Sequence, residues 1–566
     1  MDETLRRVDE IRKSSSELEN HLIDELVAGK ITRRDFIRRG AVVGLSLSSL
    51  SFIAAACGGD DDGAATGTGN GETTGQAQGG GTLRTGIIAP AGDLDPKTVA
   101  DEGGLAVLGQ SGEYLTWSDE DLMLQPRLAE SWEPNEDGSV WTFAIRQGVT
   151  FHDGRPLTAE DVAATMNTLA DPDVGSNALS VFGGVLSTGN ARAVDDATVE
   201  FTLDAPNGNF PYLVSSDNYN AIILPADYDT TQWTTDFLGT GPWMLDTYTP
   251  EVGVTYVKNP DYWDQGRQPL PDTNETKFYA EEQARVLAIQ GGEIDVLSNF
   301  SVAGGGALLN DPNLTILEIR ASQHRQIHMR TDREPFTDKR VRQAMGLLLD
   351  RQAIVDGLFE GRADLGNDSP FAPAFPSTDT TVEQREQNVE QARALLAEAG
   401  MEGGFEIELR TWDGFEIPDL AALLQDAAQQ VGITVRLNIT DPGTYYGDAV
   451  YGQSPWLDST FGITDYGHRG VPNVLLTAPL TSKGPWNSAH FKNSTYDGLV
   501  ADYAAALDLD SQRTAAREIQ ELLLDESPLL IPYFYFHLGA TRSNVGGTVE
   551  VTGMGHFDVN QAGLTG

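Results

Sequence analysis

The chain has 566 residues, of which 40 % are hydrophobic and 8 % aromatic, and its formal net charge at pH 7 is −46. This length and apolar content predict a globular protein with a large core rather than a disordered chain. So negative a surface repels nucleic acid and anionic lipid headgroups, which argues against both as partners. The single cysteine, Cys57, excludes an internal disulfide framework and a Cys/His zinc site.

Residues 32–57 have the pattern of an export signal. Arg33 and Arg34 precede a phenylalanine, an isoleucine and a second arginine pair, and no charged residue occurs in 40–56. A positive flank, an apolar run and small residues before a cleavage site are typical of such signals. Adjacent arginines indicate the twin-arginine export route. The apolar run is diluted with Gly and Ser, so it is short and weak for a permanent membrane span.

Cys57 follows this run directly. The stretch 32–38, TRRDFIR, resembles the twin-arginine motif, and 54–57, AAAC, resembles the bacterial lipoprotein box, with Ala54 where the box usually has Leu. These resemblances imply that Cys57 is lipid-modified after export of the chain. An uncleaved membrane anchor and a cleaved signal with an unmodified Cys57 are the alternatives. Residues 58–80 contain no hydrophobic residue larger than alanine, which predicts a flexible tether.

The globular part opens with a predicted strand at 82–90. Asp137-Gly138 lies between alternating apolar positions and predicts a hairpin turn. Thr158, followed three residues later by Asp161, predicts the start of a helix.

A second group of elements is predicted in the later half of the chain. Residues 392–400 have an apolar face and end in Gly400, which suits the left-handed position that closes a helix. A strand at 405–410, a helix at 418–431 and a strand at 434–439 are predicted next. The order helix, strand, helix, strand is typical of an α/β module.

One block in the first half of the chain carries a specific resemblance. It contains QPRLAESW at 125–132, DG at 137–138, WTF at 141–143 and FHDG at 151–154. In this order the motifs resemble the signature of the family 5 solute-binding proteins, the peptide- and nickel-binding receptors of bacterial ABC importers. Later motifs of the same family are GTGPW at 239–243, NPDYW at 259–263, GEID at 292–295, FTD at 336–338 and PLLIP at 528–532.

The resemblance implies an α/β, two-lobed periplasmic-binding-protein-like fold with a hinge. Lobe I would comprise 81–116, 223–322 and 530–566, with a subdomain at 117–222, and lobe II would comprise 323–529. Closure of the lobes over a ligand is a hinge motion. The implied protein is an extracytoplasmic, lipid-anchored and monomeric receptor that captures peptides and delivers them to the permease and ATPase subunits of an ABC importer.

Several other functions are open at this point. Another solute, such as a nickel chelate, an oligosaccharide or an opine, could replace the peptide, or the protein could be a sensor without transport. A secreted hydrolase is the remaining class, and the absence of GxSxG and HExxH motifs argues against it. No catalytic residue, cofactor, metal or nucleic acid is expected.

The stretch 462–472, GITDYGHRGVP, is the strongest candidate for a ligand site. It resembles the segment in which peptide-binding relatives hold the ligand's N-terminal ammonium with an aspartate, and Asp465 falls on that position, with Tyr466 next. A desolvated ammonium needs a charge-assisted partner, worth ~1.5–3 kcal/mol per hydrogen bond. Arg469 could bind a carboxylate such as a peptide's C-terminus. Alternatively, Asp465 caps a turn and Arg469 pairs with the acidic surface.

Aromatic residues are the second class of candidates, because ligand clefts are largely apolar with a few polar groups. Trp243 and Trp263 are expected in the core. His324 and His328 are four residues apart in a predicted strand and loop, where that spacing does not converge on a metal. The aromatic candidates for the cleft are Trp412, Tyr445, Tyr446, Trp456 and Tyr114.

Overall fold

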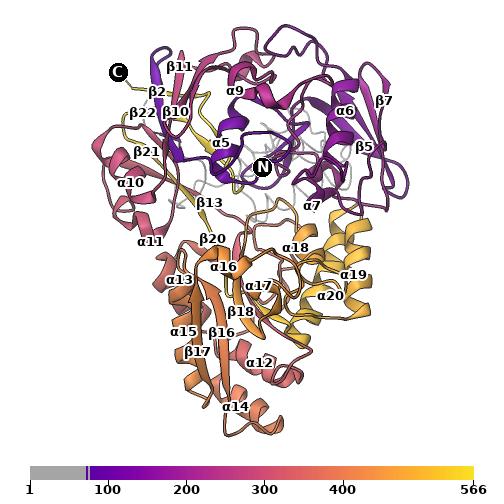
Figure 1. Cartoon of the computed structure of the whole chain (residues 1–566), viewed down its shortest axis with the longest axis vertical. Helices are drawn as coiled ribbons and strands as arrows, with labels where there is room; N and C mark the ends of the chain where they lie inside the picture. Colours follow the sequence, from indigo (N-terminus) through magenta and orange to yellow (C-terminus); the bar gives the residue numbers. More distant parts are fainter. Residues whose placement is uncertain (1–71, 74–76, 566) are drawn as a thin grey trace, which may run out of the picture. The chain divides into compact units, whose positions relative to one another are not determined.

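The computed structural model describes residues 72–73 and 77–565 (Figure 1). Arg33, Arg34, Cys57 and most of the predicted tether lie outside the described residues. Within the described ranges, no helix has both the length and the apolar character that a membrane span requires.

A seven-stranded mixed sheet forms the first lobe, in the order β13-β21-β12-β2-β11-β10-β9. β2, the strand expected at 82–90, is its middle strand and pairs in parallel with β11 and β12. β21 comes from near the end of the chain and inserts, antiparallel to both neighbours, between β12 and β13. The strands are β2 (Thr82–Ile88), β9 (Trp243–Thr249), β10 (Gly253–Lys258), β11 (Thr273–Tyr279), β12 (Val296–Phe300), β13 (Leu314–Ile319) and β21 (His537–Arg542).

Helices α5 (Glu102–Ser111) and α10 (Glu282–Gly291) pack on this sheet. The Asp101 side chain caps α5 by accepting a hydrogen bond from the N–H of Gly104 at 2.9 Å. The smaller elements of this lobe are β3 (Thr116–Ser118), β4 (Leu124–Pro126), α8 (Phe210–Leu213), α9 (Trp233–Asp236), α11 (Val302–Gly305), β1 (Glu72–Thr73), β22 (Val545–Thr548), β23 (Glu550–Val551), β24 (Phe557–Asp558) and β25 (Ala562–Leu564).

A four-stranded antiparallel sheet, in the order β5-β6-β8-β7, occupies part of the segment 117–222. The turn between β5 and β6 contains Asp137-Gly138, with Gly138 at a φ of +72°, so the predicted hairpin is confirmed. The N–H of Thr158 donates to Asp161 Oδ2 at 2.8 Å, which confirms the predicted helix start. The elements are β5 (Ala129–Pro134), β6 (Val140–Ile145), β7 (Ala191–Asp195), β8 (Thr198–Thr202), α6 (Ala159–Leu169) and α7 (Leu179–Phe182).

The second lobe is built on another mixed sheet, in the order β15-β20-β14-β18-β16-β17, with β19 paired to β14. All six residues of β14 are buried. β16 pairs in parallel with β17 and with β18, whereas β14 and β18 are antiparallel. The strands are β14 (His324–Met329), β15 (Ala363–Leu365), β16 (Glu406–Trp412), β17 (Thr434–Thr440), β18 (Phe461–Tyr466), β19 (Leu529–Leu530) and β20 (Tyr533–Tyr535).

The helix–strand–helix–strand unit predicted in the later half is confirmed to within a few residues. It consists of α14 (Val389–Glu398), β16, α15 (Ile417–Gln429) and β17, and Gly400 has a φ of +75° after α14. α19 and α20 run side by side in Figure 1. The other helices of this lobe are α12 (Lys339–Leu347), α13 (Arg351–Phe359), α16 (Pro442–Tyr446), α17 (Pro455–Asp458), α18 (Asn473–Thr477), α19 (Ser494–Ala505) and α20 (Leu509–Glu526).

The chain passes between the two large sheets at two places. It leaves the first sheet after β13, enters the second at β14, and returns from β20 to β21 through Phe536. The second lobe is therefore one continuous insertion between two strands that are neighbours in the first sheet. The β20 residues 533–535 belong to the second sheet, so the return crossing follows them. The lobe boundaries drawn from the sequence stay a prediction.

Candidate functional site

A cavity of about 330 Å³ lies where β16 and β18 end. Trp412 is the last residue of β16, and Asp465 and Tyr466 are the last two of β18. Because the two strands are parallel, their carboxyl ends meet at one edge of the sheet, the place where α/β folds present ligands. The lining residues are Trp412, Tyr446, Trp456, Asp465, Tyr466, Gly467, Arg469 and Trp486.

Aromatic rings form most of the wall of this cavity. The Tyr446 ring lies 5.4 Å from that of Trp456 and 6.2 Å from that of Trp412, between ring centroids. The Trp486 ring lies 6.2 Å from that of Tyr466 and 6.5 Å from that of Trp456. α16 supplies Tyr446 and α17 supplies Trp456, so two short helices and two strand ends hold the aromatic wall.

Asp465 supplies the carboxylate of the site. Its Oδ1 accepts a short hydrogen bond from Tyr446 Oη, and no described residue forms an ion pair with it. Burial and the Asp465 charge raise the pKa of Tyr446, so the phenol stays protonated as the donor. Burial lowers the pKa of nearby His324 to about 4, which leaves that imidazole neutral at pH 7.

Arg325 lies directly across from Asp465 in the β14–β18 ladder, but its charge is used elsewhere. Its Nε lies 2.9 Å from Glu416 Oε1, and its Nη1 donates to Tyr535 Oη at 2.7 Å. The guanidinium is also 4.5 Å from the centroid of the Tyr535 ring. Asp465 is therefore left available to a cation from outside the protein.

Arg469, which also lines the cavity, supplies a positive charge. Its backbone N–H donates to Ser322 Oγ at 2.8 Å, and its Nη1 donates to the His468 carbonyl at 2.7 Å. Burial lowers the pKa of its guanidinium, while Tyr219 and Asp217 favour the charged form.

Several polar atoms around the cavity have no hydrogen-bond partner among the described residues. Buried donors normally have one, because an unpaired donor costs roughly 1–3 kcal/mol. Together with Asp465 and the aromatic wall, these polar atoms form a site that can bind a cation, several hydrogen-bond acceptors and apolar groups. The unpaired atoms are Trp412 Nε1, Trp456 Nε1, Tyr466 Oη and Arg469 Nε.

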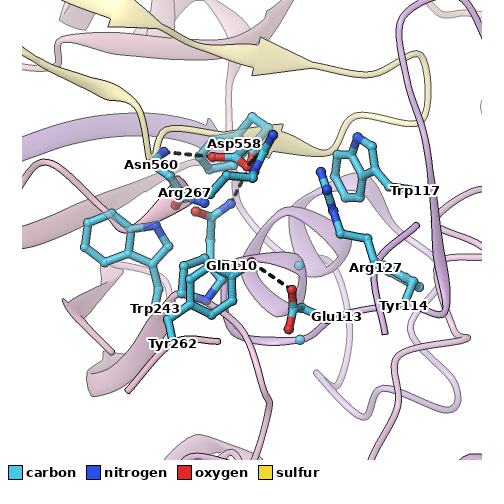
Figure 2. Close-up of a pocket in the computed structure, with 14 residues that line it drawn as sticks. Gln110, Glu113, Tyr114, Trp117, Arg127, Trp243, Tyr262, Arg267, Asp558 and Asn560 are labelled. Atoms are coloured by element: carbon cyan, nitrogen blue, oxygen red, sulfur yellow. Dashed lines mark hydrogen bonds and ion pairs between the residues drawn. The ribbon is translucent and has the colours of Figure 1, made fainter. Parts of the chain in front are cut away.

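A second pocket, of about 40 Å³, lies in the first lobe and contains Glu113 and Tyr114 (Figure 2). Glu113 accepts hydrogen bonds from Thr240 Oγ1 at 2.8 Å, Tyr262 Oη at 2.9 Å and Trp263 Nε1 at 2.9 Å. Burial raises the pKa of the Glu113 carboxyl. Arg267, which lines the same pocket, forms ion pairs with Glu550 and Asp558.

The structure brings most of the predicted site residues together. Tyr445 is buried behind the cavity, with its ring centroid 5.1 Å from that of Tyr446. Tyr114 is separated from the others, because it lines the small pocket and its hydroxyl donates to the Tyr219 carbonyl. The predicted residues that line the larger cavity are Trp412, Tyr446, Trp456, Asp465, Tyr466 and Arg469.

Trp486 is the lining residue that the sequence analysis missed. It lies in a loop between α18 and α19, where no periodic pattern or motif marks it. The only available signal is that of a tryptophan in a polar loop. Trp243 is buried, as expected, while Trp263 is half-buried and binds Glu113.

The two histidines of β14 have structural partners. His324 Nδ1 lies 2.8 Å from the Ser322 carbonyl, and His328 Nε2 lies 3.3 Å from the Ser459 carbonyl. Burial lowers the pKa of His328 to about 3. Across the described ranges, no group of three or more His, Cys, Asp or Glu residues is placed to hold a metal ion.

Comparison with known proteins gives three findings. The model of the family described as bacterial extracellular solute-binding proteins, family 5 Middle, matches residues 123–468. Heme-binding protein A of Haemophilus influenzae is 26 % identical over 437 residues, which cover 72 % of this chain and 78 % of that protein. Glutathione-binding protein GsiB of Salmonella typhi is 27 % identical over 449 residues, which cover 77 % of this chain and 85 % of that protein.

A solved structure gives the same fold. The periplasmic binding protein DppA from Helicobacter pylori, in complex with the peptide STSA, superposes with a TM-score of 0.69 at 21 % identity. The match covers 86 % of this chain and 99 % of that chain. The two-lobed α/β fold expected from the sequence is thereby confirmed.

Proposed function

We propose that this chain, which belongs to the bacterial extracellular solute-binding proteins of family 5, captures short peptides in the cavity beside Asp465 and delivers them to an ABC importer. The observation that carries the proposal is the Asp465 carboxylate, which lies in an aromatic cavity and has no ion-pair partner among the described residues. A peptide's ammonium binds Asp465, its carboxylate binds Arg469, and its side chains pack against the tryptophans. The name of one relative, glutathione-binding protein GsiB, supports this ligand class, since glutathione is itself a small peptide.

The size of the cavity favours small peptides. Its volume of about 330 Å³ is at the lower end of the ~300–1,000 Å³ range of small-molecule sites. The unpaired indole N–H groups of Trp412 and Trp456 can donate to peptide carbonyl groups. A dipeptide or tripeptide satisfies the carboxylate, the guanidinium and these donors together.

The receptor works outside the cytoplasm, and we place its attachment at Cys57. One acyl chain gives marginal membrane binding and two give stable binding, so a diacylglyceryl group on this cysteine suffices. Export by the twin-arginine route through Arg33 and Arg34 precedes lipidation. Membrane fractionation of cells that express the Cys57→Ser variant tests the anchor. The variant should be released, and its retention on the membrane would place the anchor elsewhere.

A thermal-shift screen of dipeptides and tripeptides, with heme, oligosaccharides and nickel chelates as the competing ligand classes, tests the function. A ligand at 100 times its Kd stabilises the folded protein by about 2.7 kcal/mol. Peptides with free ends should raise the Tm. Stabilisation by another class alone would assign the receptor to that solute.

Asp465→Ala tests the site itself. It should weaken peptide affinity, measured by calorimetry, tenfold or more, because the ammonium loses its charged partner. Asp448→Ala makes the same change at an exposed position outside the cavity and is the matched control. Equal affinities of the two variants would remove Asp465 from the site.

A further inference from the structure

All residues that line the cavity belong to the second lobe, where they lie between Trp412 and Trp486 in the sequence. The segment 117–222 also contacts this lobe. The N–H of Gly208 donates to the Ala504 carbonyl at 2.8 Å, and Asn209 Nδ2 donates to Asn473 Oδ1 at 2.9 Å. Charged groups of that segment can therefore act on the cavity from the other side.

Asp217 is the charged residue of that segment that lies against the loop of Arg469. A Cβ atom built on Gly470 would lie 1.7 Å from Asp217 Oδ2, so the carboxylate rests directly on the Gly470 backbone. Only glycine allows this approach, and Arg469 is the preceding residue. The contact joins the segment 117–222 to the ligand-binding loop.

The Asp217 carboxylate is buried and incompletely bonded. Asp217 is 9 % exposed, and its Oδ2 has no hydrogen-bond partner among the described residues. Arg469 Nε also has no hydrogen-bond partner among the described residues. The side chains of Asp217 and Arg469 interact electrostatically, but they form no ion pair within 4.0 Å among the described residues. Two opposite charges thus interact across the lobe contact without forming a direct ion pair among the described residues.

We propose that Asp217 is a positioning residue that balances the charge of Arg469 in the ligand-free site, and that an anionic ligand group replaces it as Asp217 takes up a proton from solvent. Arg469 keeps its positive charge throughout. In the bound state the ligand carboxylate carries the negative charge that Asp217 carried before, and Asp217 is a neutral acid, so the net charge around Arg469 is the same as in the ligand-free site. The proposal rests on the proposed function in one respect only, which is that the anionic group is a peptide carboxylate.

The surroundings of Asp217 support this exchange. Burial raises its pKa to about 7, the Ser118 hydroxyl and the charge of Arg469 oppose that rise, and Asp119 adds to it. Tyr212 is the other titratable group that interacts with it. A second carboxylate at Arg469 disfavours the ionised form of Asp217 further. The folded, ligand-bound protein then holds one proton more than the ligand-free protein above pH 7. Affinity for an anionic ligand therefore falls as the pH rises through this range.

The test uses the peptide Phe-Ala-Ala and its C-terminal amide, with affinities measured by calorimetry at pH 6 and pH 8. Both peptides share the titration of the α-amino group, so their difference isolates the carboxylate. Between these pH values the free acid should lose up to about tenfold more affinity than the amide. At pH 7, binding of the free acid in buffers of different ionisation enthalpy should report uptake of about half a proton.

Asp217→Asn, an isosteric neutral variant, should abolish the extra loss of affinity shown by the free acid. Asp364→Asn is the control, because Asp364 is another carboxyl whose pKa burial raises, but it pairs with Arg320 away from the cavity. That control should keep the extra loss. The same pH dependence for both peptides in the unaltered protein, or an unchanged difference in Asp217→Asn, would overturn the proposal.

A second measurement needs no ligand and no substitution of Asp217. Carbon NMR of the Asp217 carboxyl in the ligand-free protein should show a pKa higher by about one unit in Arg469→Gln, since the opposing cation is lost. An unchanged pKa would contradict the charge balance even if neither peptide binds. Failure of both peptides to bind, together with the expected NMR shift, would refute the peptide function and leave the Asp217–Arg469 coupling intact.

Discussion

The two pockets of this molecule are built from the same kinds of residues and differ in how their polar groups are satisfied. Each has a carboxylate, an arginine, tryptophans and tyrosines. In the small pocket Glu113 accepts three hydrogen bonds and Arg267 pairs with two carboxylates. In the larger cavity Asp465 has one tyrosine donor, and Arg469 has a backbone carbonyl.

The Glu113 network fits a structural role and the larger cavity fits the proposed ligand site, although one donor of the small pocket, Trp243 Nε1, also has no partner among the described residues. A buried polar network that is complete adds stability and rigidity to the protein, whereas an incomplete one costs free energy unless a ligand completes it. Composition alone does not distinguish the two cases. The test is to make equivalent substitutions in both pockets and to measure both unfolding and ligand affinity.

The two carboxylates should show the largest contrast. Glu113→Met leaves three donors without an acceptor, two of them on the buried residues Thr240 and Tyr262, so the free energy of unfolding should fall by roughly 3 kcal/mol or more. Asp465→Leu should change stability by less than about 1 kcal/mol while abolishing measurable peptide affinity. Denaturant unfolding and calorimetry measure the two effects. A stability loss for Asp465→Leu as large as that for Glu113→Met would mean that both carboxylates are structural.

The indole N–H groups should show an intermediate contrast. Trp263→Phe removes the donor to Glu113 and should cost about 1–2 kcal/mol of stability. Trp456→Phe removes an N–H that has no partner among the described residues, so stability should fall by less than about 1 kcal/mol. Its peptide affinity should fall severalfold, as calorimetry can measure. Unaltered affinity in Trp456→Phe would show that this N–H does not meet the ligand.

The tyrosine hydroxyls should show the smallest contrast. Tyr262 Oη donates to Glu113, and Tyr446 Oη donates to Asp465. Replacing either tyrosine by phenylalanine removes this hydrogen bond and keeps the ring. Tyr262→Phe should cost about 1 kcal/mol of stability, and Tyr446→Phe about half of that or less, because its site is open. Tyr446→Phe should bind peptide about threefold more weakly, since Asp465 loses the group that orients it. Stronger binding would show that the hydroxyl competes with the ligand.

Much of the fold could be predicted because its signals are local. The alternation of β16, the apolar face of α14 and the cap at Gly400 each lie within a few residues, and the structure has these elements to within a few residues. Asp465 and Tyr466 were found through a family motif, and Trp412, Tyr446 and Trp456 were found as aromatic candidates for a largely apolar cleft. Their common position follows from parallel strands, whose ends share an edge.

The rest depends on contacts between distant parts of the chain. The three donors to Glu113 come from residues 127 to 150 positions away, so an isolated glutamate next to Tyr114 gives no hint of its role. Trp486 reaches the cavity from a loop without periodicity. Tyr114 was predicted as an aromatic candidate for the cleft, whereas the path of the chain after α5 puts it in the other pocket.

The position of β21 has a consequence for biosynthesis. Residues 537–542 lie between β12 and β13, so the facing edges of these two strands stay unpaired until residues 537–542 have left the ribosome. The whole second lobe is synthesised before the first sheet can close. A premature stop codon shortly before His537 would thus remove an interior strand, rather than a dispensable tail, and would leave two edges free to pair with other chains.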